Sequence, residues 1–369
     1  MSRSTTTARM GALLARGRRD DPRATRPTGS RIAGATSRLR AKGGQLMTGS
    51  DRDAHALPSA RAIPLLRLLL VLAALFFASA CANSSPPLPE GHARPPFVRV
   101  ETERGPTLFL LGTFHLGPPG GWRLSPEIEH VLVEADTLVL ELAPDAVDPN
   151  AVGSALAQRV VLPVGIELAD VVAPETQALL EAHDEALSQA GMSANARRRL
   201  KPWYIAIRLA EKAVAGADLS FETAVESELV AGFRGTGTVG LETFEDQLDS
   251  LDGLPPDVQD LLLRDTVQHL DEASADLLEE TEAWRRADRD ALEAQALMGI
   301  DESPDLEPLR RAMLDDRNRR WMPQLTALLE DAGRRDETVL VAVGALHVVG
   351  EVGLPALLEK AGYTVHRIH

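Results

Sequence analysis

Cysteine and aromatic side chains are scarce in this chain of 369 residues, and its 39 Lys and Arg are outnumbered by 54 Asp and Glu. The one cysteine excludes an internal disulfide framework and any cysteine-rich zinc or iron–sulfur site. Aromatic residues make up only 4 %, which argues against stacking platforms for single-stranded nucleic acid. The formal net charge of -15 repels phosphate, so we expect no nucleic-acid partner.

The apolar run Leu68–Phe77 is too short to span a bilayer. Its ten residues are about half of the ~20 that a membrane helix needs, and they match the apolar core of a secretory signal. Arg61 and Arg67 precede the run, and three small residues separate it from Cys81. This order resembles a bacterial lipobox, in which the cysteine is lipidated and acyl chains anchor the protein. A plain secretory signal with a coincidental cysteine is the alternative.

Charge divides the chain into two parts. The first 80 residues hold 14 Lys and Arg against 4 Asp and Glu, a net charge of +10, which leaves -25 for residues 81–369. Residues 1–46 are predicted to be a disordered Arg-rich extension or an over-extended gene start, residues 47–81 a signal peptide with lipobox, and residues 82–96 a Pro-rich tether. The expected location is the cell envelope, lipid-anchored on the periplasmic side. Ala82 after the cysteine favours the outer membrane, by resemblance to the enterobacterial sorting rule.

Residues 97–369 are predicted to form one α/β domain, a mixed, largely buried central sheet with an inserted, mostly helical subdomain at about 144–336. Short apolar runs predict strands at Phe97–Glu101, Thr107–Leu111, Thr137–Leu142, Thr238–Leu241, Thr338–Val343 and Tyr363–Ile368. Apolar spacings of three and four, with capping signals, predict helices at Ser125–Ala135, Pro174–Ala190, Ala194–Ala215, Phe221–Ala231, Pro256–Ala332 (with breaks) and Leu354–Ala361.

A quasi-repeat is the most informative feature of the chain. LFLLGTFHLG (108–117) and LVAVGALHVVG (340–350) each pair an apolar strand with a Gly-x-x-His motif. The glycines are Gly112 and Gly344, and the histidines are His115 and His347. In open α/β sheets ligands bind at the carboxyl ends of the strands. If the two strands are neighbours, imidazoles 232 residues apart in sequence converge there.

Two convergent neutral imidazoles are good ligands for a divalent metal ion, and a carboxylate usually completes such a site. Glu141 is the first candidate because it interrupts a buried strand, where an unpartnered carboxylate is unfavourable. Glu242, after the short strand TVGL, is the second. One of the two would ligate the ion while the other acts as base on a water. The alternative for each motif histidine, and for Glu141, is a purely structural role.

These residues resemble the TraB/PrgY/GumN family, which is grouped with the Tiki proteases, the erythromycin esterases and the haem-binding ChaN-like lipoproteins. The matching segments are LLGTFHLG (110–117), the strand LVLEL, VGLETFEDQL (239–248), RNRRWM (317–322) and VAVGALHVVGEVGL (341–354). The family hallmark, two GxxH motifs and a Glu, falls here on His115, His347 and Glu141. Glu242, Gln247, Arg317 and Asn318 match further family positions.

One family element departs from the pattern. Many relatives carry Gly-(Val/Ile)-Asp before the Gly-Leu-Glu strand, where this chain has FETAVESEL (221–229). Glu222 and Glu226 are the two candidates to take the place of that Asp.

The resemblance implies a metal-dependent, peptidase-like hydrolase tethered to the cell envelope. His115, His347 and Glu141 would hold a divalent ion, with Zn, Mn or Co all plausible. Arg317 or Asn318 would steady an oxyanion or a substrate carboxylate. The expected partners are a peptide or small-molecule substrate and the membrane. Two alternatives stay open, a non-catalytic lipoprotein that binds haem or another ligand, and one that sequesters a peptide signal.

Overall fold

The computed structural model describes residues 91–369, apart from 145–148, 190, 298–299 and 301–303. The predicted Arg-rich extension, the signal peptide, Cys81 and the first part of the Pro-rich tether lie outside the described residues. The described residues all belong to one compact unit, Ser59–His369.

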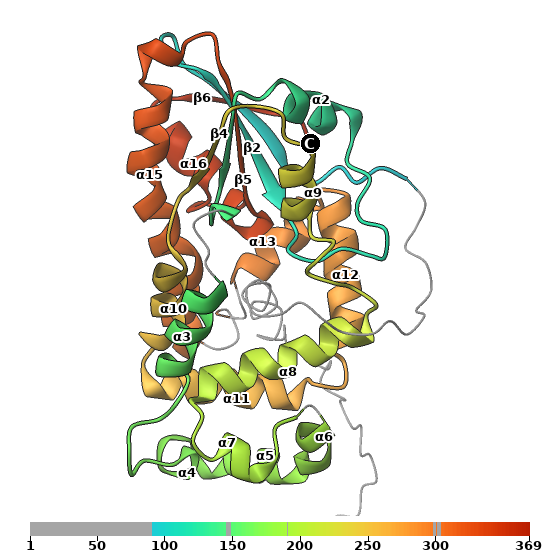
Figure 1. Ribbon diagram of the computed structural model, residues 1–369, viewed down its shortest axis with the longest axis vertical. Helices are drawn as coiled ribbons and strands as arrows, with labels where there is room; N and C mark the ends of the chain where they lie inside the picture. Colours follow the sequence, from blue (N-terminus) through green and yellow to red (C-terminus); the bar gives the residue numbers. More distant parts are fainter. Residues whose placement is uncertain (1–90, 145–148, 190, 298–299, 301–303) are drawn as a thin grey trace, which may run out of the picture. The chain divides into compact units, whose positions relative to one another are not determined.

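A mixed six-stranded sheet forms the centre of the fold, with strand order β4-β3-β5-β2-β1-β6 (Figure 1). Strands β4, β3, β5 and β2 run parallel, whereas β1 is antiparallel to β2 and β6 is antiparallel to β1. The predicted α/β class is therefore confirmed. The strands are β1 (Phe97–Glu101), β2 (Thr107–Thr113), β3 (Thr137–Leu140), β4 (Gly237–Gly240), β5 (Thr338–Gly344) and β6 (Thr364–Arg367).

Strand β3 is shorter than predicted. We expected it to run to Leu142, but it ends at Leu140, whose partner Ala342 is the last residue of β5 that pairs with β3. Glu141 has no partner on β5 and follows the strand rather than interrupting it, although its carbonyl still accepts the Glu242 N–H. Its side chain stays buried, with 9 % of its surface exposed.

Helices cover both faces of the sheet (Figure 1). On one face, α2 (Pro126–Glu134), α9 (Val225–Gly232), α12 (Ala273–Arg285) and α13 (Arg289–Leu297) pack against alternate strand residues such as Leu111 and Leu340. On the other face, α15 (Asp316–Leu329) and α16 (Leu354–Lys360) pack against Leu110 and Val341. Burial on both faces explains why the central strands are apolar at successive positions.

A mostly helical subdomain has its own apolar core, built largely by α5 (Pro174–Ala182), α8 (Pro202–Gly216), α10 (Phe244–Asp252) and α11 (Pro256–Gln268). Phe114 and Leu346, which follow β2 and β5, pack against this core, so the subdomain adjoins the carboxyl ends of these strands. The helices within about 144–336 are not all part of it, because α9, α13 and α15 pack on the sheet instead.

The remaining helices are α3 (Pro149–Arg159), α4 (Leu168–Val171), α6 (Asp184–Gln189), α7 (Ala194–Arg197) and α14 (Glu307–Arg310). Shorter turns are η2 (Pro304–Leu306), the π-helical η3 (Arg311–Asp315), η4 (Ala332–Arg334) and η5 (Ala345–Val348). Among the described residues, no helix combines the length and the apolar character needed to cross a membrane.

Candidate functional site

The two GxxH motifs follow neighbouring strands. Strands β2 and β5 pair in parallel, with Gly112 opposite Val343 and Thr113 opposite Gly344. Both motifs therefore leave the sheet at the same edge, and the predicted adjacency is confirmed. Glu141 leaves the next strand, β3, at that edge.

Each motif glycine lets neighbouring groups approach the backbone more closely than a side chain would allow. A Cβ on Gly112 would lie 2.8 Å from Val348 Cγ2, so β2 packs against η5 more closely than a side chain would permit. A Cβ on Gly344 would lie 3.1 Å from His115 Nε2 and 3.3 Å from Glu141 Oε1. The missing side chain of Gly344 thus leaves the space between the first imidazole and the carboxylate open.

His115 is held by a carboxylate on α9. Its Nδ1 lies 2.8 Å from Glu226 Oε1, which also accepts a hydrogen bond from the Thr113 hydroxyl. Burial alone would lower the pKa of His115, but Glu226 and then Glu141 outweigh it and raise the pKa to about 9. The Nδ1–H donates to Glu226, so Nε2 faces the site, where it is buried and has no hydrogen-bond partner.

His347 has the opposite electrostatic setting. Its Nδ1 lies 2.7 Å from Asn318 Oδ1, and Asn318 Nδ2 donates to the Val352 carbonyl, so the imidazole Nδ1–H is the donor to Asn318. Burial and then the Arg317 guanidinium lower the pKa of His347 to about 3. The imidazole is therefore neutral, and its Nε2 accepts a hydrogen bond of 3.1 Å from Arg317 Nη1.

Glu141 lies between the two imidazoles. Its Oε1 is 3.9 Å from His115 Nε2 and 3.8 Å from His347 Nε2, and it accepts the Gly344 N–H at 2.7 Å. Burial would raise the pKa of this carboxyl, but Arg317 and then the imidazoles hold it well below its usual range. Glu141 is therefore an anion over the whole physiological pH range.

Arg317 and Glu242 form a buried clamp behind this carboxylate. Arg317 Nη2 donates to Glu141 Oε2 at 2.5 Å and also pairs with Glu242, whose other oxygen accepts the Trp321 indole N–H at 3.2 Å. Arg317 follows the π-helical turn η3, which changes the direction in which the next residues of α15 point. Glu242, expected as a ligand or base, instead contacts Arg317, and it does not line the adjacent pocket.

A pocket of about 440 Å³ opens beside His115 and Glu141. Its volume is in the range of small-molecule sites, which run from roughly 300 to 1,000 Å³. Gln247 of α10 and Glu226 of α9 also line it. Gln247 Nε2 lies 3.4 Å from Glu141 Oε2, so this residue links the pocket to the carboxylate.

Within the described part of the chain, no three His, Cys, Asp or Glu side chains form a ready-made metal centre. At His347, Arg317 Nη1 occupies the lone pair that a metal ion would use. Sequence reasoning did not anticipate this contact, since it placed Arg317 near the substrate.

The donor set nevertheless fits a divalent ion in charge and in chemistry. His347 is neutral, and His115 would give up a proton to bind a metal ion through Nε2. The three carboxylates of Glu141, Glu226 and Glu242 would then exceed the single guanidinium of Arg317 by two negative charges. A divalent ion would balance that excess, and the unpartnered His115 Nε2 offers it a ligand. His115, His347 and Glu141 would hold it once Arg317 Nη1 released His347.

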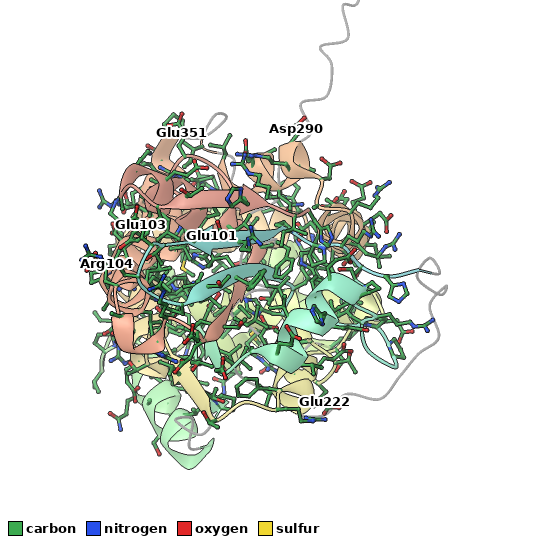
Figure 2. The ribbon with its side chains drawn as sticks, turned by 90° about the horizontal axis from the view of Figure 1, so that it is seen from above. Glu101, Glu103, Arg104, Glu222, Asp290 and Glu351 are labelled. Atoms are coloured by element: carbon green, nitrogen blue, oxygen red, sulfur yellow. The ribbon has the colours of Figure 1, made fainter. Side chains whose placement is uncertain are left out.

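The sequence did not decide between Glu222 and Glu226, and it did not assign a role to Gln247. Of the two acidic candidates before the Gly-Leu-Glu strand, Glu226 contacts His115, whereas Glu222 is exposed, at the margin of the molecule in Figure 2. Gln247 had been noted only as a family match. On α10 it lies three residues after Phe244 and four before Leu251, and this spacing was the available signal that it shares their buried face.

Comparison with known proteins agrees with these motifs. Over 72 residues the chain is 38 % identical to a protein of Amphimedon queenslandica named "Metalloprotease TIKI homolog", a stretch that covers 18 % of this chain and 14 % of that relative. No solved structure matches the chain. The model of the TraB/PrgY/gumN family matches residues 96–367, nearly all of the described sheet and helices. This chain therefore belongs to the TraB/PrgY/gumN family.

Proposed function

We propose that this protein is a metal-dependent hydrolase of peptide bonds, with His115, His347 and Glu141 as the ligands of a divalent ion. One observation carries the proposal. Two imidazole Nε2 atoms from neighbouring strands lie 3.9 and 3.8 Å from the same oxygen of a buried carboxylate, beside a pocket. Such a convergence of buried polar groups is unfavourable for a core and typical of a reaction site.

The chain's own residues would prepare this site. Glu226 and Asn318 each hold the Nδ1 of one imidazole, so that both Nε2 atoms face Glu141. Arg317 and the Gly344 N–H keep Glu141 ionised and in place. A divalent ion at this position would act as a Lewis acid on the scissile carbonyl and lower the pKa of water.

The family and the sponge relative support the peptidase-like part of the proposal. The relative bears the name of a metalloprotease, and its similarity is confined to a short stretch. The choice of a peptide substrate and of a divalent ion therefore rests mainly on the geometry of the site.

The test combines a metal assay with a digest. The purified full chain is expected to retain about one divalent ion per chain, measured by plasma mass spectrometry after dialysis, and to cleave members of a peptide library. The double variant His115→Ala, His347→Ala should lose both properties. His366→Ala is the matched control, because this imidazole is half exposed on β6 and pairs with Glu101, which is also exposed.

Two results would count against the proposal. Equal metal content in the double variant and the wild type would remove the ligand assignment. Peptide binding without any cleavage would favour the sequestering alternative over an enzyme.

We also propose that the protein is anchored to the cell envelope by lipidation of Cys81. The support is the order of features in the sequence: two arginines, an apolar run, small residues and the single cysteine.

A further inference from the structure

The pocket beside the reacting groups, here called the β3–α9 pocket, has a largely apolar wall. His115 and Glu141 line it together with residues from the end of β3, the segment before α9, and α9 itself. Six of the residues that line the pocket are apolar: Leu140, Leu142, Pro144, Phe221, Ala224 and Val230. An apolar group that enters this space would be removed from water, which is favourable.

Two buried acceptor atoms of the pocket residues have no partner. Glu226 uses Oε1 to hold His115, and its Oε2 is buried without a hydrogen bond. Gln247 directs its Nε2 toward Glu141, because an ionised carboxylate only accepts, so the unpartnered atom is the carbonyl Oε1. Gln247 is only 5 % exposed. A buried acceptor without a donor costs free energy, so a ligand that donates N–H groups to these two atoms would be stabilised in the pocket.

The charges of the pocket residues also disfavour an anionic ligand. None of the described residues that line it is a lysine or an arginine. Arg317 is nearby but only 1 % exposed, and its donors are directed at Glu141, Glu242, His347 and the Met313 carbonyl. His115 lines the pocket as a cation at neutral pH, but its Nδ1 already pairs with Glu226. The carboxylates of Glu226 and Glu141 outnumber it, so an entering carboxylate or phosphate would meet a net negative charge.

We propose that the β3–α9 pocket binds an apolar residue of a peptide substrate, with peptide N–H groups donating to Glu226 Oε2 and Gln247 Oε1. This subsite rests on the proposed peptidase function, since it places the apolar residue beside the bond that His115 and Glu141 would act on. It selects peptides over anionic esters, and apolar over acidic side chains.

Equilibrium binding tests the subsite separately from turnover. The full chain in EDTA, where metal-dependent cleavage is suppressed, is titrated calorimetrically with the blocked peptides Ac-Ala-Leu-Ala-NH2 and Ac-Ala-Asp-Ala-NH2. A third ligand is the leucine peptide with its leucine N–H replaced by an ester oxygen. The leucine peptide should bind about 10-fold more tightly than the aspartate peptide. The ester analogue should bind about 10-fold more weakly than the leucine peptide, because an acceptor then stays unpaired.

Two variants localise the effect. Val230→Asp adds a charge to the pocket wall at a position that is 41 % exposed, so folding is preserved, and it should weaken leucine-peptide binding at least 5-fold. Val133→Asp on α2 is the matched control, because Val133 is 63 % exposed and does not line the pocket. It should leave binding unchanged.

The outcomes separate the subsite from the proposed function. Equal binding of the three ligands, no binding of any, or equal effects of the two valine variants would overturn the subsite. Selective binding that depends on Val230, without cleavage when metal is restored, would keep the subsite and remove the peptidase. Cleavage with no preference at the apolar residue would keep the peptidase and remove the subsite.

Discussion

Replacing Arg317 by methionine would test whether the buried charges form one interdependent unit. The side chain is 1 % exposed and donates to both Glu141 and Glu242, whose side chains are 9 % and 3 % exposed. Methionine is similar in length and apolar, so it fills much of the same space but leaves the two carboxylates without their shared cation.

The expected loss of stability is large. Removing one partner of a buried ion pair destabilises a protein by about 3–5 kcal/mol, since the remaining charge stays buried without compensation. For a domain of this size, each kcal/mol corresponds to about 2 °C in melting temperature, so the variant should melt about 6–10 °C lower at pH 7.

The loss of stability in Arg317→Met should also depend on pH, and it should be largest at neutral and higher pH. In the wild type the pKa of Glu141 is held below its ordinary value of 4.5, so its contribution to stability is present above pH 4.5 and disappears as the pH falls through the folded value. In Arg317→Met the Glu141 carboxyl has lost its main cationic partner, and its pKa rises. The difference in melting temperature should therefore shrink as the pH falls from 8 toward 4.

Thermal unfolding followed by circular dichroism from pH 4 to pH 8 provides the measurement. Arg319→Met, two residues along the same helix, is the control, because Arg319 is 51 % exposed and pairs with the exposed Asp316. Its effect should stay within about 0.5 kcal/mol. A melting temperature for Arg317→Met within 1–2 °C of the control, or a deficit that is the same at all pH values, would refute the view that Arg317 balances these carboxylates.

Three further predictions concern Gly344, Glu226 and Cys81. Gly344→Ala should reduce metal retention and peptide cleavage while the protein still folds, because the new Cβ would lie 3.1 Å from His115 Nε2. Glu226→Gln should lower the pKa of His115 from about 9 in metal-free protein, seen by NMR titration. The wild type should lose His115-linked stability as the pH rises from 6.5 through about 9, and this variant should not. Cys81→Ser should abolish labelling by radioactive palmitate.

Each of these predictions has a comparison that would contradict it. Gly153→Ala, where a new Cβ meets nothing within 4 Å, should be neutral, and an equal loss of activity in both glycine variants would remove the steric explanation. Glu222→Gln should leave the His115 titration unchanged, because Glu222 is exposed and distinct from the carboxylate that contacts the imidazole. Persistent labelling of the Cys81 variant would show that the lipid is elsewhere.

Sequence pattern alone was sufficient for the class of fold and for the identity of the principal groups. Apolar runs identified the six strands, because a strand buried on both faces must be apolar at successive positions. The repeated Gly-x-x-His motif identified His115 and His347, since a short strand followed by glycine and a polar ring is a local pattern. Glu141 was found because an acid beside a buried strand requires compensation.

The tertiary structure decided how those groups differ from one another. Both histidines follow the same motif, yet one is held by the carboxylate of Glu226 and the other lies against the guanidinium of Arg317, so their pKa values shift in opposite directions. Glu226 comes from α9, which is distant in sequence from β2, and Arg317 comes from α15, the α-helix that precedes β5. Charge, burial and hydrogen-bond geometry at a buried site depend on residues that are close in space. A local sequence pattern does not show which residues these are.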